Sequence, residues 1–561
     1  MRRHISKLAR RRAGYRAPTI VQILLSGCAA TLLLAQATPD LAIEVPQWQA
    51  HDFTFKSSTK HENPFKVGFS AEISGPGGIH FTQPGFYDGD ATWKLRLGPN
   101  TPGGWSLRTV SSDPELDGKT AENIICVQQQ NPRVHGGLLV DPEHLHHFVR
   151  EDGTRFFYSG FECDWLWAVD LATCDPRLPQ TTILLDKLAA HGFNVVLMNI
   201  YAHTGFGRLG QQPNFGPPPR YAWGGSNDKP DHSVFNLPFW QHYDRVIQAL
   251  WERGIEAHIM LKVYNKHVNW PQTGSPEDDL YFKYALARYA PFCNVHWDFA
   301  KESNNEKNLA YKLDRMAFIR QHDPYRRLLT THTDHGAYRH YYGVLDYRTD
   351  QNHTNFYRTA LRQRSRERWP VVNSEYGYEQ GPGGPEDKTY SGANDALTVF
   401  KRAWEVYMAG AYGAYYYTYT SWDVVRVNDT PTGYGYYKHL SDFFSRAGLW
   451  RMAPDDSLVD AGHCLANPGV EYVVYQPENR AFTLKVAGAK GGLATEWFNP
   501  LTGATVKAPA IQNGDCRLSP PAEWTNGPVV FHIGTCPKEK AVFRNTFTRP
   551  LPVKASTDPA E

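Results

Sequence analysis

Residues 280–302, LYFKYALARYAPFCNVHWDFAKE, contain the repeating unit on which the fold prediction rests. Leu280–Ala290 has the apolar spacing of an amphipathic helix. Val295–Ala300 is a short apolar run, as expected for a parallel strand that is buried on both faces. Such a helix-then-strand unit predicts an α/β domain with a parallel sheet.

The same alternation continues on both sides of this unit. The expected helices are 181–191, 239–253, 280–290, 309–322, 359–368 and 394–408. The expected strands are 156–158, 194–201, 256–262, 295–300, 327–332, 345–351, 370–375 and 412–419. Eight strands alternating with helices predict a (β/α)8 TIM barrel, which we place at 150–452. A doubly wound sheet is disfavoured because no glycine-rich phosphate turn follows the first strand.

Two regions outside the barrel have a different pattern. Short alternating strands separated by turn residues predict an N-terminal β-sandwich at 45–130. After residue 455 the helical pattern stops, and strands around Asn499-Pro500 and Asn513-Gly514 predict a C-terminal β-sandwich at 455–545.

The N-terminus has the composition of an export signal. Arginines and a lysine precede an apolar run at 20–35, so we expect a signal peptide at 1–37 that is cleaved after Ala37. The alternative is a lipid anchor at Cys28, since Leu25-Ser26-Gly27-Cys28 resembles a lipobox. Either reading predicts a secreted, periplasmic or surface-attached protein with no membrane span.

Charge and cysteine content limit the partners and the covalent chemistry. Lys and Arg total 59 against 57 for Asp and Glu, so no basic face for nucleic acid is expected. In an oxidising compartment, spacing allows disulfides between Cys163 and Cys174 and between Cys516 and Cys536. No cofactor is expected.

The expected fourth and seventh strands each lead to a glutamate. Strand four leads to Lys301-Glu302, and strand seven leads through Asn373-Ser374 to Glu375. Catalytic groups of a barrel lie at the carboxyl ends of its strands. Two carboxyl groups are what glycosidic bond cleavage requires, one to protonate the leaving oxygen and one to attack or to activate water.

This pattern resembles clan A of the glycoside hydrolases. The chain is similar to multidomain bacterial members with an apiosidase-like barrel, through Phe86-Tyr87-Asp88-Gly89 in the front sandwich and Trp497-Phe498-Asn499-Pro500 in a rear, collagen-binding-like sandwich. The resemblance implies a retaining enzyme acting on plant or algal polysaccharide or derived oligosaccharides. It also implies that Glu302 is the acid/base and Glu375 the nucleophile.

One residue departs from the clan pattern. Lys301 stands where the clan has an asparagine that binds the substrate. One explanation is that Lys301 binds an anionic group of the substrate; the other is that it forms an ion pair with Glu306 or Asp298.

Further strand-end residues are expected to line the cleft. Trp422 follows strand eight and resembles the clan's indole platform, while His332 and His353 follow strands five and six and are expected to bind the sugar or orient Glu375. The remaining candidates follow strands one and two: Asp164, Trp165, Tyr201 and His203.

Two other functions stay open. A metal-dependent barrel hydrolase is disfavoured, since His144-Leu145-His146-His147 precedes strand one and His332-Thr333-Asp334-His335 has no third ligand nearby. A non-catalytic carbohydrate-binding protein is disfavoured by the two intact glutamates, although Lys301 leaves it possible.

Overall fold

A computed structural model describes residues 42–204, 213–334, 336–382, 393–488, 494–524 and 526–534. The predicted signal peptide, the lipobox at Cys28, His335 and Cys536 lie outside these ranges. Among the described residues no helix is both long and apolar enough to cross a bilayer.

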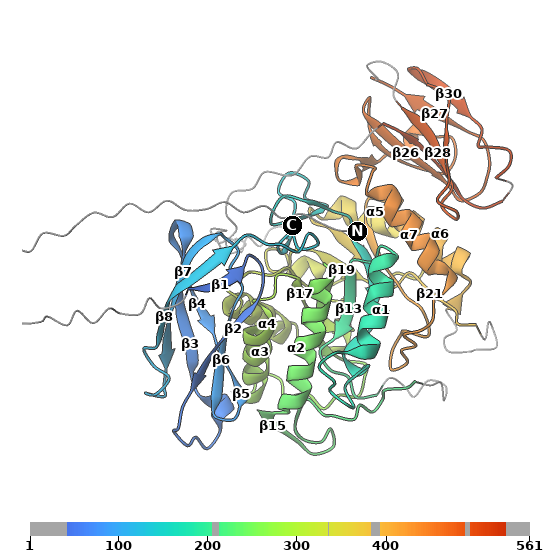
Figure 1. The fold of residues 1–561 in the computed structure, drawn as a ribbon. Coiled ribbons are helices and arrows are strands. Elements are labelled where there is room, and N and C mark those ends of the chain that lie inside the picture. Colours follow the sequence, from blue (N-terminus) through green and yellow to red (C-terminus); the bar gives the residue numbers. More distant parts are fainter. Residues whose placement is uncertain are drawn as a thin grey trace, which may run out of the picture. The chain divides into compact units, whose positions relative to one another are not determined.

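Eight parallel strands form the central sheet, and their order around the barrel follows the chain. A parallel bridge between His332 and Thr349 joins the two edge strands, the fifth and the sixth. The strands are β12 (Ser159–Glu162), β13 (Val195–Asn199), β16 (Glu256–Val263), β17 (Val295–Lys301), β18 (Leu329–Thr330), β19 (Arg348–Asp350), β20 (Val371–Asn373) and β23 (Tyr412–Tyr415). The predicted (β/α)8 barrel is confirmed (Figure 1).

Seven helices accompany these strands in the described part of the chain. They are α1 (Pro179–Ala190), α2 (Leu237–Glu252), α3 (Pro276–Tyr289), α4 (Leu309–His322), α5 (Phe356–Arg366), α6 (Ala396–Met408) and α7 (Thr432–Phe444). The sequence pattern did not predict α7, because Gly433 and Gly435 in its first turn lower helix propensity.

Side-chain caps begin three of these helices. Ser275 accepts from the backbone N–H of Asp278 to start α3, and Asn308 accepts from that of Tyr311 to start α4. Asp395 does the same for α6. Each cap satisfies a backbone donor that the first helical turn leaves without a partner, so the helices begin near their predicted positions.

The first barrel strand lies later in the chain than predicted. It is β12 rather than 156–158, and Phe156 belongs to β11 (Arg155–Phe156), which pairs with β10 (Phe148–Arg150) in an antiparallel sheet with β9 (Leu138–Val140). Gly160 lies inside β12, two residues after the end of the predicted strand. A Cβ at Gly160 would come within 2.8 Å of the Ala414 side chain, so this strand contact requires glycine.

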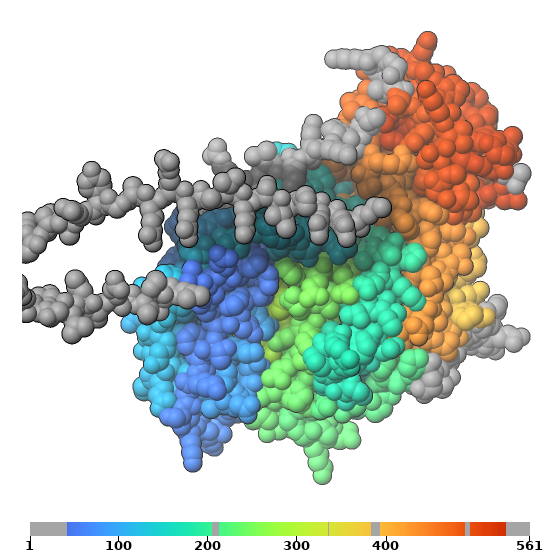
Figure 2. Space-filling view, in the orientation of Figure 1, coloured from blue at the N-terminus to red at the C-terminus, as the bar shows by residue number. Residues whose placement is uncertain are grey.

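The N-terminal module is the predicted sandwich. Its sheets contain β1 (Ile43–Pro46), β8 (Thr120–Val127), β7 (Gly103–Ser111), β3 (Phe69–Gly75) and β4 (Ile79–Pro84), facing β2 (His51–Lys56), β6 (Thr92–Leu97) and β5 (Phe86–Gly89). Trp93, Trp105 and Leu107 are among the residues of its own core. Arg96 bridges Asp52 of the sandwich and Asp244 of α2, which fixes the module against the barrel. Figure 2 shows the surface of the sandwich (blue) beside the helical part of the barrel (green).

The C-terminal module is also a sandwich. It contains β24 (Ala453–Pro454), β25 (His463–Asn467), β26 (Glu471–Gln476), β31 (Val529–Ile533), β28 (Thr495–Phe498) and β29 (Thr505–Lys507), with β27 (Phe482–Val486) and β30 (Gly514–Leu518) as a second sheet. Tyr475 stacks on Trp404 of α6 at 5.1 Å between ring centroids. Short pairs complete the described strands: β14 (Trp223–Gly225) with β15 (Pro230–Phe235), and β21 (Tyr378–Glu379) with β22 (Ala393–Asn394).

The first predicted disulfide is absent. Cys163 is a buried free thiol and Cys174 a partly buried one. Cys516 is also free in the described part of the chain, and its predicted partner Cys536 lies outside that part.

Candidate active site

Glu375 lies just past the carboxyl end of β20, the seventh barrel strand, and only 4% of the residue is exposed. Its Oε1 accepts a hydrogen bond from Gln351 Nε2, and its Oε2 accepts one from the Tyr378 hydroxyl. The backbone N–H of Glu375 donates to Asn373 Oδ1 at 3.2 Å. Both carboxylate oxygens are therefore held in fixed positions.

Lys301 is the last residue of β17, the fourth strand, and is 1% exposed. Its ammonium contacts Glu162 and lies 3.1 Å from both carboxylate oxygens of Asp164. It also lies 3.2 Å from Oε1 of Glu375. Neither Glu306 nor Asp298, the predicted ion-pair partners, is among its partners, because Glu162 and Asp164 reach the ammonium from strand one.

These contacts set the charge of each group. Burial opposes ionisation of Glu375, but the Lys301 ammonium, His332 and the Tyr378 hydroxyl outweigh it and hold the pKa of Glu375 well below its usual value. Burial also opposes the charge of Lys301, yet Asp164, Glu162 and Glu375 keep its pKa well above the usual value. Burial, reinforced by the neighbouring carboxylates, raises the pKa of Glu162 despite the contact with Lys301.

The result is a cluster in which burial favours the protonated form of Glu162, while the Lys301 ammonium favours the ionised form of Glu375. Carboxylates this close cannot all ionise around a single ammonium, so they titrate as a coupled group. The predicted contact between Lys301 and an anionic substrate would require this cluster to open, since the ammonium already has three carboxylate neighbours.

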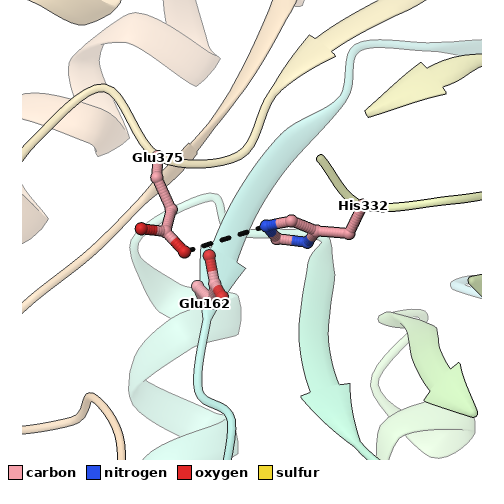
Figure 3. Close-up of side chains that lie close together, drawn as sticks. All are labelled: Glu162, His332 and Glu375. Atoms are coloured by element: carbon pink, nitrogen blue, oxygen red, sulfur yellow. Dashed lines mark ion pairs between the residues drawn. The ribbon is translucent and has the colours of Figure 1, made fainter. Parts of the chain in front are cut away.

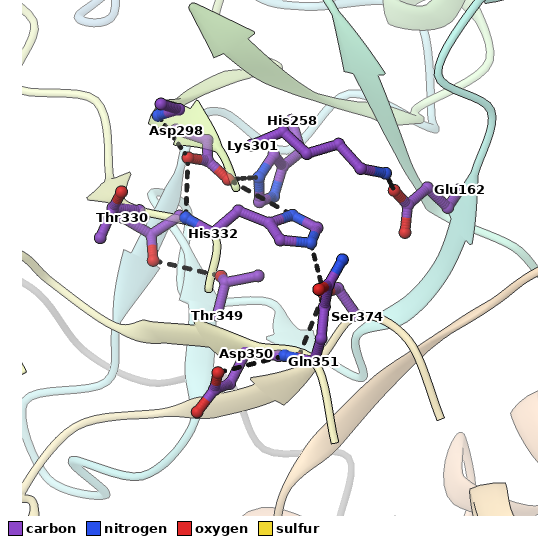
Figure 4. Close-up of polar contacts among 12 residues, drawn as sticks. Glu162, His258, Asp298, Lys301, Thr330, His332, Thr349, Asp350, Gln351 and Ser374 are labelled. Carbon is purple, nitrogen blue, oxygen red and sulfur yellow. Dashed lines mark hydrogen bonds and ion pairs between the residues drawn. The ribbon is translucent and has the colours of Figure 1, made fainter. Parts of the chain in front are cut away.

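His332 belongs to a chain of polar contacts with Ser374, Asp298 and His258 (Figure 4). His332 Nε2 lies 3.7 Å from Glu375 Oε1 and 3.1 Å from the hydroxyl of Ser374. The backbone N–H of His332 donates to Asp298 Oδ1 at 3.0 Å, and Asp298 in turn pairs with His258 at 2.8 Å. His332 thus lies beside Glu375 at the end of strand five.

Glu302 directly follows β17 and is half-buried, with φ at 57°. Thr333 after β18 and Trp422 after β23 have φ values of 57° and 54°. Left-handed backbone at residues other than glycine is unfavourable and is found most often at functional sites. Three such residues therefore lie past the carboxyl ends of barrel strands four, five and eight.

Lys266, on the loop after β16, is a second buried lysine in this region. Burial lowers its pKa to about 8, with Lys301 acting in the same direction and the carboxylates of Asp164, Glu375 and Glu302 opposing it. The same ammonium therefore interacts electrostatically with both predicted catalytic glutamates.

Three residues of the site offer metal-ligand atoms within 4.8 Å of one another: Glu162, His332 and Glu375 (Figure 3). The Lys301 ammonium contacts two of these three residues. A metal ion would have to displace a buried ammonium that already supplies the positive charge, so the donor set does not fit a resident metal.

Four further residues were predicted to line the cleft, and two of them, Trp165 and Tyr201, pack inside the protein instead. Trp165 and Tyr201 belong to the hydrophobic core, where both contact Trp167. They were expected to line the cleft, but an aromatic residue just past a strand end can equally pack inward, as these do. His203 is partly buried and hydrogen-bonds the Tyr201 hydroxyl at 3.1 Å. His353 is exposed, but its ring stacks on Tyr378 at 6.4 Å between centroids, so it lies near the site and its role stays a prediction.

Trp422 lies close to the nucleophile candidate. Its indole stacks on Tyr378 at 5.3 Å, and Tyr378 is the residue that donates to Glu375. Only 6% of Trp422 is exposed. Its role as a sugar platform stays a prediction.

Sequence reasoning missed five members of the site: Glu162, Lys266, Gln351, Tyr378 and Tyr416. Glu162 ends strand one, and its position would have been found with the correct bounds of that strand. The hydroxyl of Tyr416 donates to Asp164 at 3.0 Å, a contact that crosses 252 residues of sequence and leaves no local signal.

The barrel has the same fold as solved glycoside hydrolases. A Bacteroides vulgatus ATCC 8482 protein assigned as a glycoside hydrolase has a TM-score of 0.71 at 20% identity, covering 88% of this chain and 100% of that one. A glycoside hydrolase family 5 protein from the same organism has a TM-score of 0.53 at 17% identity, covering 71% and 93%.

The family follows from the sequence match. The model of the apiosidase-like catalytic domain matches residues 143–460, more than half of the chain. The protein belongs to this family and is a glycoside hydrolase. Residues 44–112 match a domain of unknown function, DUF5060. No curated protein matches the sequence.

Proposed function

We propose that the protein is a retaining glycoside hydrolase in which Glu375 is the nucleophile and Glu302 the acid/base. The observation that carries the proposal is the environment of Glu375. A nucleophile must be ionised, and the Lys301 ammonium at 3.2 Å together with the Tyr378 hydroxyl keeps this carboxylate charged despite its burial.

Glu302 has the contrasting environment that an acid/base needs. Glu302 is half-buried rather than buried. The ammonium of Lys301, the residue before it, is paired with other carboxylates. When two carboxyl groups have different environments, one can act as an ionised nucleophile and the other as the group that gives and takes a proton.

The proposed reaction has two steps. The Glu375 carboxylate attacks the anomeric carbon while Glu302 gives its proton to the departing oxygen, which leaves a glycosyl ester on Glu375. Glu302 then takes a proton from water, the water oxygen attacks the anomeric carbon, and the Glu375 carboxylate departs. The substrate is hydrolysed with net retention.

The substrate class is a carbohydrate of plant or algal origin, polysaccharide or oligosaccharide. Because the matching family is described as apiosidase-like, we choose apiosides as the first sugars to test. The export signal predicted at 1–37 would place this activity outside the cytoplasm.

The test is hydrolysis of a panel of aryl glycosides, including an aryl apioside, by wild type, Glu375→Gln and Glu302→Ala. Glu375→Gln should lose nearly all turnover on every hydrolysed substrate. Glu302→Ala should spare substrates with good leaving groups, which need no proton. Glu306→Gln, a nearby carboxyl change, should retain wild-type turnover.

Equal losses from Glu375→Gln and Glu302→Ala on an activated substrate would contradict this division of roles. Full activity of Glu375→Gln would remove the nucleophile assignment. No turnover by wild type on any substrate, with binding of the same sugars, would favour the non-catalytic carbohydrate-binding alternative.

A further inference from the structure

A cavity lies at the opposite end of the barrel from Glu375. It has a volume of about 370 Å³ and is bordered by Trp450 and by Ala466 and Asn467 of β25. Its position is fixed by His147, whose Nδ1 hydrogen-bonds the hydroxyl of Tyr412, the first residue of β23. We call it the basic pocket, after the lining residues His144, His146, His147, Arg364, Arg368 and Arg451.

Arg364, on the last turn of α5, has an unusual environment. In the described part of the chain, its one hydrogen bond is a long one of 3.5 Å, which Nη1 donates to the carbonyl of Gly410. Gly410 has a φ of 70°, and a Cβ there would lie 2.9 Å from Arg364 Nε, so glycine lets the guanidinium approach this closely. Burial lowers the pKa of Arg364 to about 10, and only Tyr412 opposes that effect.

In the described part of the chain, no carboxylate is paired with the Arg364 guanidinium to balance its charge. No ion pair there involves Arg364 or Arg368, whereas Arg451 is paired with Glu471. A partly dehydrated guanidinium is usually matched by a carboxylate or a phosphate, which its planar fork binds through two hydrogen bonds.

The charged residues beside Arg364 in this pocket include two more arginines, Arg368 and Arg451. Burial, together with Arg364 and Arg368, lowers the pKa of His146 to about 4, so this ring is neutral near pH 7 and adds no charge. Burial and Arg364 also lower the pKa of His147. Glu143 is the carboxylate on the lining of the pocket, and it is exposed. Among the described residues that line the pocket, Arg364 and Arg368 therefore supply more positive charge than Glu143 opposes.

We propose that the basic pocket binds a sulfate or phosphate group through Arg364 and Arg368. The source of this group is either a free ion or an ester on a sugar. The cavity is larger than a single oxyanion needs, since one water takes about 30 Å³, so it has room for part of an attached sugar ring.

The experiment measures binding of sodium sulfate and sodium phosphate to the full chain by calorimetry, with sodium chloride at equal ionic strength as the reference. Wild type should bind both oxyanions in preference to chloride. Arg364→Gln and Arg368→Gln should each weaken oxyanion binding by about tenfold or more, the loss expected for a charge-assisted contact.

Arg366→Gln is the matched control. Arg366 lies on the same last turn of α5, so it shares the helix-end electrostatics, but it is exposed and does not line the pocket. Its binding should equal that of wild type. Arg368 is also exposed, so its variant should fold even if Arg364→Gln does not.

Glucose 6-sulfate and glucose 6-phosphate distinguish the two sources. Tighter binding of the esters than of the inorganic ions would identify a carbohydrate ester site, and equal binding a free-ion site. The proposal is overturned if wild type shows no preference for any of these anions over chloride, or if Arg366→Gln loses as much binding as Arg364→Gln and Arg368→Gln.

Discussion

Replacing Lys301 with methionine should raise the pKa of the nucleophile. The Lys301 ammonium lies 3.2 Å from Glu375 Oε1, and at an effective dielectric constant of about 20 two unit charges at that distance interact by about 5 kcal/mol. The ammonium is shared with Glu162 and Asp164, so we assign about half of this energy to Glu375. That half corresponds to a shift of about two pKa units.

The assay is the pH dependence of kcat/KM on the best aryl glycoside. In Lys301→Met the acidic limb should move upward by about two pH units, because Glu375 stays protonated to a higher pH. Near pH 5 the variant should therefore lose far more activity than near pH 8. Loss of one partner from a buried ion pair should also lower the free energy of unfolding by about 3–5 kcal/mol.

Lys262→Met separates the catalytic effect from loss of stability. Lys262 is equally buried and pairs with Asp278 at 2.7 Å, but its charged neighbours do not include the glutamates of the site. The Lys262→Met variant should therefore lose stability, but the acidic limb of its kcat/KM profile should stay at the wild-type pH. The reasoning is refuted if Lys301→Met raises KM and leaves the limb in place, because Lys301 would then contact the substrate directly.

Three further outcomes follow from the structure. Tyr378→Phe removes the hydroxyl that donates to Glu375, and steady-state kinetics should show kcat/KM lower by about 10- to 100-fold; unchanged kinetics would exclude Tyr378 from the site. Burial raises the pKa of Glu379 from 4.5 to about 7. The folded state therefore binds more protons across that range, and denaturant titrations should show stability falling by roughly 3 kcal/mol as pH rises from 4.5 to 7. Glu379→Gln should abolish that dependence, and an unchanged slope would reject the raised pKa. Alkylation of the denatured, unreduced protein should label both Cys163 and Cys174, and mass spectrometry that finds them joined would contradict the free thiols.

The barrel could be predicted from the sequence because its strands are short, continuous apolar runs between amphipathic helices. β17, for example, is buried along its whole length, as the run from Val295 suggests. The first strand was predicted too early in the chain because glycine is depleted in strands, which disfavoured a strand across Gly160. Gly160 instead gives room for the close approach of Ala414, a constraint that appears only when strands one and eight are adjacent.

The two glutamates could also be placed on strands four and seven, because their positions depend only on local strand bounds. The surroundings of Lys301 could not be predicted. Its partners Glu162 and Asp164 precede it by more than 130 residues, and only barrel closure brings them to its ammonium. The burial of Trp165 depends on side-chain direction past a strand end, which composition and periodicity do not determine.

The central claim is that Glu375 forms a covalent bond to the sugar. The most direct test is incubation of wild type with an activated 2-deoxy-2-fluoro derivative of the sugar that it hydrolyses fastest, followed by peptide mapping by mass spectrometry. If Glu375 is the nucleophile, we expect one glycosyl adduct, located on Glu375. We also expect full modification of Glu302→Ala when the leaving group is good. An adduct on another residue would contradict it, as would a first-formed product of inverted anomeric configuration with no adduct.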